Sequence, residues 1–109
     1  MSKEQLSAEQ AQAEVNYWKS YWNMRCIDTM LKLVKENQTL TADTFRAAMV
    51  EQNCPPRLIA LNAPAILKSF LHQRYLRKER NYILSDNGSR VLPVYTSLKY
   101  EPKTVIASN

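Results

Sequence analysis

Residues 62–80 read NAPAILKSFLHQRYLRKER, and this stretch decides the fold. It opens with a proline, which suits the first turn of a helix because its missing N–H has no intrahelical partner there. Apolar side chains then recur at helical spacing, at Ile66, Leu67, Phe70 and Leu71. We therefore expect an amphipathic helix that starts at Asn62 to Pro64 and leads into a basic segment.

The opposite face of this helix is small and polar, with Ala65, Lys68, Ser69, His72 and Gln73. Two interpretations remain open: an ordinary solvated face, or a surface that fits the major groove of DNA. Between residues 68 and 80 the basic residues outnumber the single acid, Glu79, by five to one. The positive charge is therefore concentrated at the end of the helix, on Lys68, Arg74, Arg77, Lys78 and Arg80.

The periodicity changes after Arg74. Two runs rich in aromatic and β-branched residues, 75–84 and 91–96, flank Asn87-Gly88. Asn-Gly between such runs predicts a tight β-hairpin, because both central residues of its turn need a positive φ. Pro93 predicts that the returning strand lies at a sheet edge, where a missing N–H donor costs little.

Upstream, the chain predicts two more helices. Ser7 with Gln10 is a capping-box pattern, and no glycine or proline follows before Pro55, so a long helix from about residue 7 to about residue 36 is expected. After a polar break at 37–40, Thr41 caps a second helix, which the prolines at 55–56 end. Residues 57–61 read as a short apolar connector or as one further helical turn. The inward-facing residues of the second helix are Phe45, Ala48 and Met49.

The long first helix has two apolar stripes on different faces. One comprises Ala11, Val15, Trp18, Trp22 and Cys26, and the other comprises Ile27, Met30, Leu31 and Val34. Either the helix breaks near residues 23–25, or its halves pack on different partners. The first half also carries Tyr17 and Tyr21, and exposed aromatics at this density mark interfaces. Homodimerisation, packing within the chain and contact with another protein or with bases remain open, and the surface assigned to oligomerisation or a partner is Val15, Trp18, Tyr21 and Trp22.

Composition excludes most enzyme classes. His72 is the sole histidine and Gly88 the sole glycine, so histidine-rich metal sites and glycine-rich phosphate loops are absent from the sequence. We expect no catalytic residue, no metal and no cofactor. Cys26 and Cys54 read as free buried thiols. The 109 residues suit one domain, which carries a net charge of +5. The sequence shows no apolar signal core and no membrane-spanning run, so a cytoplasmic protein is expected.

The order helix, helix, helix, then a hairpin with a basic first strand resembles winged helix-turn-helix domains. The resemblance covers residues 41–96 and is greatest for the small stand-alone domains of phages and mobile elements. It rests on the threonine-capped segment Thr41-Ala42-Asp43-Thr44-Phe45, the Asn-bearing turn before the third helix, and the basic hairpin that ends at Tyr95. Two features depart from the pattern: Arg74-Tyr75-Leu76 replaces the usual Gly-Leu entry to the first strand, and the aromatic front of the first helix is extra.

The resemblance implies a mainly α protein with a C-terminal β-hairpin, in the α+β class. Residues 25–98 would form the winged-helix domain, 1–24 an aromatic helical extension and 99–109 a polar tail. A non-enzymatic protein that binds duplex DNA is then expected, as a small transcription regulator or a replication or accessory factor, through helix 62–74 and hairpin 75–96. The alternative is a protein-interaction or inhibitor module that uses Tyr17, Trp18, Tyr21 and Trp22. The expected DNA-contacting residues are Lys68, Ser69, His72, Gln73, Arg74, Arg77, Lys78, Arg80 and Arg90.

Overall fold

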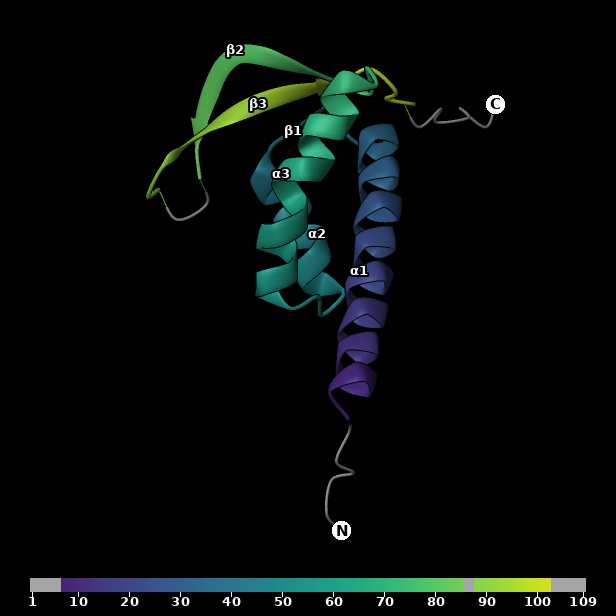
Figure 1. The fold of residues 1–109 in the computed structure, drawn as a ribbon. Helices are drawn as coiled ribbons and strands as arrows, with labels where there is room; N and C mark the ends of the chain where they lie inside the picture. Colours follow the sequence, from purple (N-terminus) through teal and green to yellow (C-terminus); the bar gives the residue numbers. More distant parts are fainter. Residues whose placement is uncertain (1–6, 86–87, 103–109) are drawn as a thin grey trace, which may run out of the picture.

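The computed structural model describes residues 7–85 and 88–102, and its first element is the long helix α1, Ala8–Glu36 (Figure 1). The predicted capping box is present: the Ser7 hydroxyl accepts from the N–H of Gln10, whose side chain accepts from the N–H of Ser7. The helix is continuous, so a break near residues 23–25 is wrong. Its first half extends past the ends of α2 and α3.

The buried side of α1 belongs to its second half, at Cys26, Thr29, Met30 and Val34. The two stripes expected from the sequence merge there. At 100° per residue, Trp22, Cys26 and Thr29 lie within about 60° of one another, so the stripe that starts on the first half runs into the core. Trp22 is accordingly half-buried and packs against the core.

Helix α2, Ala42–Glu51, begins and ends on hydrogen-bonded caps. Thr41 caps its start, as predicted, and Thr44 completes a capping box. At its end Asn53 has a φ of 63°, and the N–H of Cys54 donates to the carbonyl of Met49 at 3.1 Å. This Schellman motif closes the helix before the paired prolines are reached.

Helix α3 runs Pro56–His72, so the predicted start at Asn62 to Pro64 is wrong. Pro56 occupies the first turn, where its missing N–H costs nothing, and residues 57–61 are the first turns of the helix. Ile59 in this segment is buried in the core. Pro64 lies inside the helix on its exposed side, where solvent can satisfy the carbonyl that loses its donor.

The sheet has three antiparallel strands among the described residues, where the sequence predicted a two-stranded hairpin. These are β1 (Thr39–Leu40), β2 (Leu76–Leu84) and β3 (Val91–Ser97), in the order β1-β3-β2. Pro93 therefore lies in β3, the central strand, and the prediction that its strand lies at a sheet edge is wrong. It is tolerated because β1 pairs only with Tyr95 and Thr96, and because the β2 register shifts between Lys78 and Tyr82, opposite this region.

The hairpin between β2 and β3 is confirmed, but its turn differs from the predicted one. The N–H of Ser85 donates to the carbonyl of Arg90, and the N–H of Gly88 donates to the carbonyl of Ser85, both at 2.8 Å. Gly88 has a φ of 70° and is the fourth residue of this turn, not a central one. Residues 86–87, which include Asn87, lie outside the described part of the chain.

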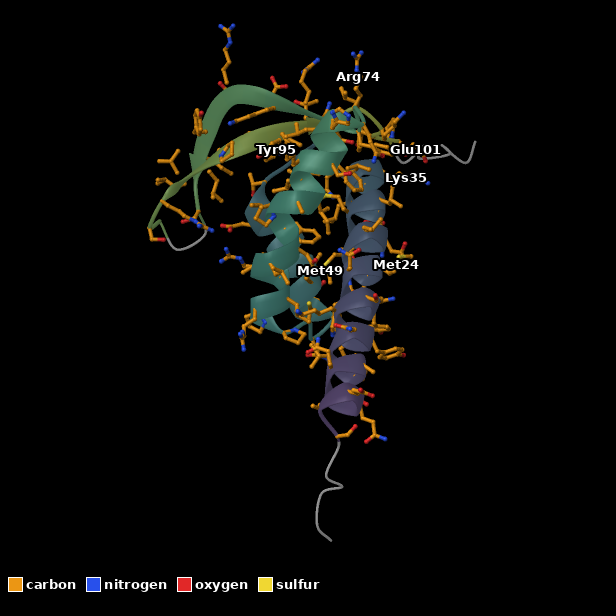
Figure 2. The ribbon with its side chains drawn as sticks, in the orientation of Figure 1. Met24, Lys35, Met49, Arg74, Tyr95 and Glu101 are labelled. Carbon is orange, nitrogen blue, oxygen red and sulfur yellow. The ribbon has the colours of Figure 1, made fainter. Side chains whose placement is uncertain are left out.

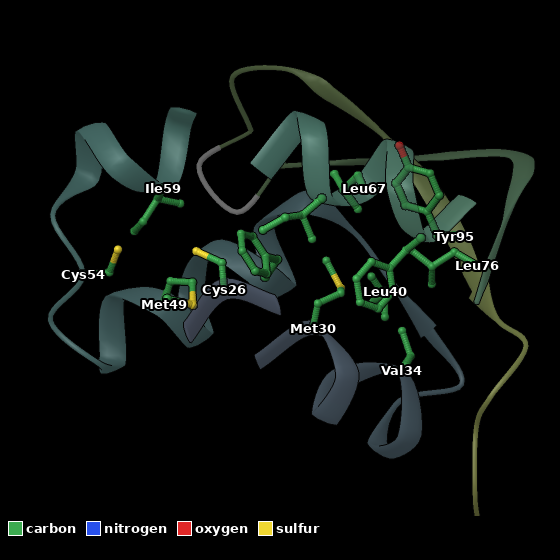
Figure 3. Packing of buried hydrophobic residues seen from close by; sticks show 13 residues of the cluster. Cys26, Met30, Val34, Leu40, Met49, Cys54, Ile59, Leu67, Leu76 and Tyr95 are labelled. Carbon is green, nitrogen blue, oxygen red and sulfur yellow. The ribbon is translucent and has the colours of Figure 1, made fainter. Parts of the chain in front are cut away.

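The core lies where α1, α2, α3 and the sheet meet (Figure 3). Its fully buried side chains are Phe45, Met30, Met49, Val34 and Cys26, and the strands add Leu40, Leu76 and Tyr95. The predicted apolar face of α3 is confirmed, with Ile66, Leu67 and Phe70 buried and Leu71 partly so. Cys26 and Cys54 are buried free thiols, as predicted.

The segment after β3 is held against the body of the protein. The N–H of Leu98 donates to the carbonyl of Tyr75 at 2.9 Å, and the N–H of Glu101 donates to the carbonyl of Lys35 at 3.0 Å. The polar tail was expected from residue 99, with Tyr100 or Val105 as points that could pin part of it; the chain is held against the body as far as Glu101, and residues 103–109, which include Val105, lie outside the described part. Over the described residues the fold is a mixed α+β, mainly helical structure, which confirms the predicted class at that level.

Candidate nucleic-acid interface

The residues predicted on the polar face of α3 lie together on its exposed side. Lys68, Ser69 and His72 are all exposed, opposite the buried Ile66 and Phe70. Gln73 caps the helix, and its Nε2 donates to the Ser69 hydroxyl at 3.1 Å. The C-terminal half of α3 thus offers a polar surface with mixed donors and acceptors.

Arg74 joins this surface to the sheet in a backbone conformation that arginine rarely adopts. Its φ is 63°, and the N–H of Tyr75 donates to the carbonyl of Phe70 at 2.9 Å, which makes a second Schellman motif. Glycine is the usual residue at this position because a Cβ costs free energy there. At Arg74-Tyr75-Leu76, where the winged-helix pattern has Gly-Leu, this chain therefore places a cation in a position that favours glycine. The position is the junction of α3 and β2 (Figure 2).

Charge is distributed unequally along the chain. Residues 1–51 hold six Lys and Arg against seven Asp and Glu, whereas residues 52–100 hold eight against two. The two acids of the second half are Glu79 and Asp86. Residues 52–78, which contain the whole of α3, therefore have no carboxylate side chain. The segment that forms α3 and the start of β2 therefore carries only positive charges.

Glu79 neutralises part of this charge. Its carboxylate accepts from Nε of Arg77 at 2.9 Å, an ion pair on the surface of β2. The hydrogen bond from Arg77, and a second one from Thr96, hold the pKa of Glu79 below its usual range. Arg77 is therefore a weaker candidate for phosphate contact than the sequence indicated.

The basic residues of the hairpin do not all point the same way. Directly paired residues of antiparallel strands lie on the same face of the sheet. Arg77 pairs with Thr96, and Lys78 pairs with Tyr95, whose ring is buried on the side that faces the helices. Lys78 consequently shares the helix side with α3, and Arg77 lies on the other. Arg80 is exposed in the segment where the register shifts.

Arg90 is separate from the α3 group. It lines a hollow of about 410 Å³ between the hairpin and α2, together with Asp43, Arg46, Ser85 and Ser89. The sequence grouped Arg90 with the hairpin cations, but Arg90 lines the same hollow as Arg46 of α2. That placement could not be anticipated, because it depends on where the hairpin tip lies.

Lys99 is a basic residue that the sequence reasoning missed, because residues 99–109 were taken as tail. Its Nζ lies 5.3 Å from the centroid of the Tyr75 ring, in cation–π geometry. The Tyr75 ring in turn lies 5.1 Å from that of Phe70 in α3. Lys99 therefore adds a cation beside Arg74, and no local sequence signal indicated this.

The aromatic residues of α1 form a second surface. Val15, Trp18 and Tyr21 are each about half exposed, while Trp22 is largely engaged with the core. Consecutive rings from Tyr17 to Trp22 meet edge to face, with centroids 5.1 to 5.6 Å apart. Tyr17 and Met24 are more exposed still, at 61% and 58%. Three of the four residues predicted for a partner are thus accessible.

Within residues 7–85 and 88–102, no group of His, Cys, Asp and Glu side chains could hold a metal ion. His72, the sole histidine, is exposed on α3. Burial raises the pKa of the Cys26 thiol to about 11, which opposes formation of a reactive thiolate. The described helices include none with the length and apolar character needed to cross a bilayer.

Comparison with protein-family models, with curated proteins and with solved structures gave no match.

Proposed function

We propose that this chain is a winged-helix protein that binds duplex DNA without catalysing a reaction, as a small regulator or accessory factor. The element order supports the fold assignment: α1, β1, α2, α3 and then the β2–β3 hairpin, with β3 between β1 and β2. In this arrangement α2 and α3 form the helix-turn-helix, and the hairpin is the wing.

The second helix of such a motif enters the major groove. Here that helix is α3, whose exposed Lys68, Ser69 and His72 would face base edges and phosphates. Arg74 and Lys99 at its C-terminal end, with Lys78 and Arg80 on the wing, would contact the phosphate backbone. Arg77 would contribute less because Glu79 already pairs with it.

The observation that carries the proposal is the run of basic residues at the junction of α3 and β2, within a segment that has no carboxylate from residue 52 to residue 78. A left-handed arginine in a glycine position costs stability, and strain of this kind is retained more readily where the side chain has a use. Charge focused on one junction also favours an anionic partner over a random solvated face.

Fluorescence anisotropy with a labelled random-sequence duplex tests the proposal. If about six phosphates are contacted, the dissociation constant should rise about 10³-fold between 50 and 200 mM salt. Lys78→Glu with Arg80→Glu should abolish measurable binding at 150 mM salt. The matched control is Arg25→Glu with Lys32→Glu, which makes the same charge change at exposed positions of α1 near α2 and should weaken binding only slightly.

Two results would contradict DNA binding through this surface. One is a dissociation constant that does not change with salt. The other is an equal loss of affinity in both double variants, which would indicate only a response to net charge. Far-ultraviolet circular dichroism of each variant ensures that a loss of binding is not a loss of fold.

A further inference from the structure

The first half of α1 has little to pack against within its own chain. At 1.5 Å per residue the 29-residue helix is about 43 Å long, and it has no buried residue before Cys26. Figure 1 shows this half projecting beyond α2 and α3. Its larger apolar side chains, Val15, Trp18 and Tyr21, are 40–46% exposed, so this half presents an apolar surface that its own chain leaves largely uncovered.

A groove lies beside the same half of α1. It is formed between α1 and the start of α3, measures about 580 Å³, and has apolar walls from Val15, Trp18, Pro55, Leu58 and Leu61. Leu61 is 60% exposed, and Val15 and Trp18 are 46% exposed. Charged side chains stand at the rim of the groove: Glu14, Lys19 and Arg57.

We propose that this groove holds the first half of α1 from a second copy of the chain, in a twofold-symmetric antiparallel dimer. The same helix that forms one wall carries Ala11, Val15 and Trp18 at steps of four and three, which is the spacing of a helix–helix seam. A twofold interface needs one self-complementary patch, and a groove with a matching ridge on the same segment provides it.

The charges favour a second copy as the occupant. Residues 7–18 carry only acidic charges, on Glu9 and Glu14, whereas the α3 side of the groove carries Arg57 in a segment without carboxylates. When two copies pair antiparallel about the twofold axis, the acidic half of each helix approaches Arg57 of the other. Electrostatic complementarity of this kind sets orientation more than affinity.

The accessible area indicates a dissociating dimer. An aromatic side chain presents about 150–250 Å² when fully exposed, so half-exposed Trp18 and Tyr21 offer roughly 100 Å² each. With Val15, Leu58, Leu61 and backbone, each copy would bury on the order of 500 Å², or about 1,000 Å² in total. That is the low end for specific interfaces, where weak, reversible association is typical.

The dimer does not depend on DNA binding. It would join two copies through α1 and the start of α3, and leave the polar face of the C-terminal half of each α3 and both hairpins outside the interface. If DNA binding also holds, one dimer would present two reading helices, and its sites would be paired half-sites. The two proposals fail separately, because self-association is measured without nucleic acid.

Sedimentation velocity from 1 to 300 µM tests the inference. The natural chain should convert from monomer to dimer within this range, and Trp18→Ala with Leu61→Ala should raise the dissociation constant at least tenfold. Met24→Ala is the control, since Met24 is 58% exposed but lies on the side of α1 away from α2 and α3 (Figure 2), and it should leave association unchanged. Arg57→Glu should weaken the dimer, and Glu14→Arg in the same chain should restore part of the loss.

The tryptophans give an independent readout. The chain has two, Trp18 and Trp22, so Trp22→Phe leaves Trp18 as the sole emitter. Its emission should shift to shorter wavelength with concentration as the groove closes. A natural chain that stays monomeric at 300 µM, or a Trp18/Leu61 variant that associates unchanged, would overturn the dimer. Circular dichroism confirms that each variant remains folded.

Discussion

Arg74→Gly should raise stability and lower DNA affinity at the same time. Arg74 has a φ of 63°, and a side chain in the left-handed region costs roughly 1–2 kcal/mol relative to glycine. Glycine loses about 0.5–1 kcal/mol of this advantage because it is more disordered in the unfolded chain. The net gain should be about 0.5–1 kcal/mol, which for a chain of this size is a rise in melting temperature of about 2–6 °C.

Two further variants separate backbone strain from charge. Arg74→Ala removes the cation but keeps a Cβ at the same φ, so it should lose affinity as Arg74→Gly does without gaining stability. Asn53→Gly changes the matching position at the end of α2, which also has a φ of 63°. Asparagine tolerates this conformation better than arginine, so the gain in stability should be smaller and DNA affinity unchanged.

The assays are urea unfolding followed by circular dichroism, and anisotropy at two salt concentrations. Loss of one phosphate contact should reduce the slope of log affinity against log salt by about 0.9. An Arg74→Gly protein no more stable than Arg74→Ala would refute the strain argument. Unchanged affinity in both variants would remove Arg74 from the DNA surface.

Two other perturbations test the packing of the body. Gln52→Ala should lower the free energy of unfolding by about 1–2 kcal/mol. The reason is that Gln52 Nε2 donates to the buried Thr29 hydroxyl at 2.7 Å and its Oε1 accepts from Arg25 at 2.6 Å. A urea midpoint equal to that of the natural chain would contradict this. Burial raises the pKa of Cys26 from 9.0 to about 11, so its contribution to stability is complete below pH 9 and is lost as the pH rises towards 11. Between pH 8 and 10 the natural chain should lose roughly 1 kcal/mol more stability than Cys26→Ala, and parallel pH profiles would disprove the linkage.

Local signals in the sequence predicted the elements whose causes are local. The capping box at Ser7, the cap at Thr41 and the helical spacing of Ile66 to Leu71 lie within a few residues of the structures they specify. The start of α3 was missed because two adjacent prolines read as a break. Pro56 instead lies in the first turn of α3, where proline is favoured, and α2 has already ended at the Schellman motif of Asn53 and Cys54.

The candidate site was predicted residue by residue, but not as a surface. The exposed side of α3 followed from periodicity, so Lys68, Ser69 and His72 were placed correctly on one face. Strand register decided the rest: Arg77 and Lys78 are neighbours in sequence, yet they lie on opposite faces of the sheet. The pairing of Arg77 with Glu79 and the place of Lys99 beside Tyr75 also depend on contacts that no local pattern encodes.

The sequence alone determined that this protein is basic in its second half, mainly helical and aromatic at the front of its first helix, because composition and periodicity are properties of the chain itself. The tertiary structure decided that β1 adds a third strand, that Pro93 lies in the central strand, that residues 98–101 join the body and that a groove lies beside Trp18. Each of these depends on the pairing of segments distant in the sequence. Such pairing is fixed by how the whole core packs, and the residues on either side do not specify it alone.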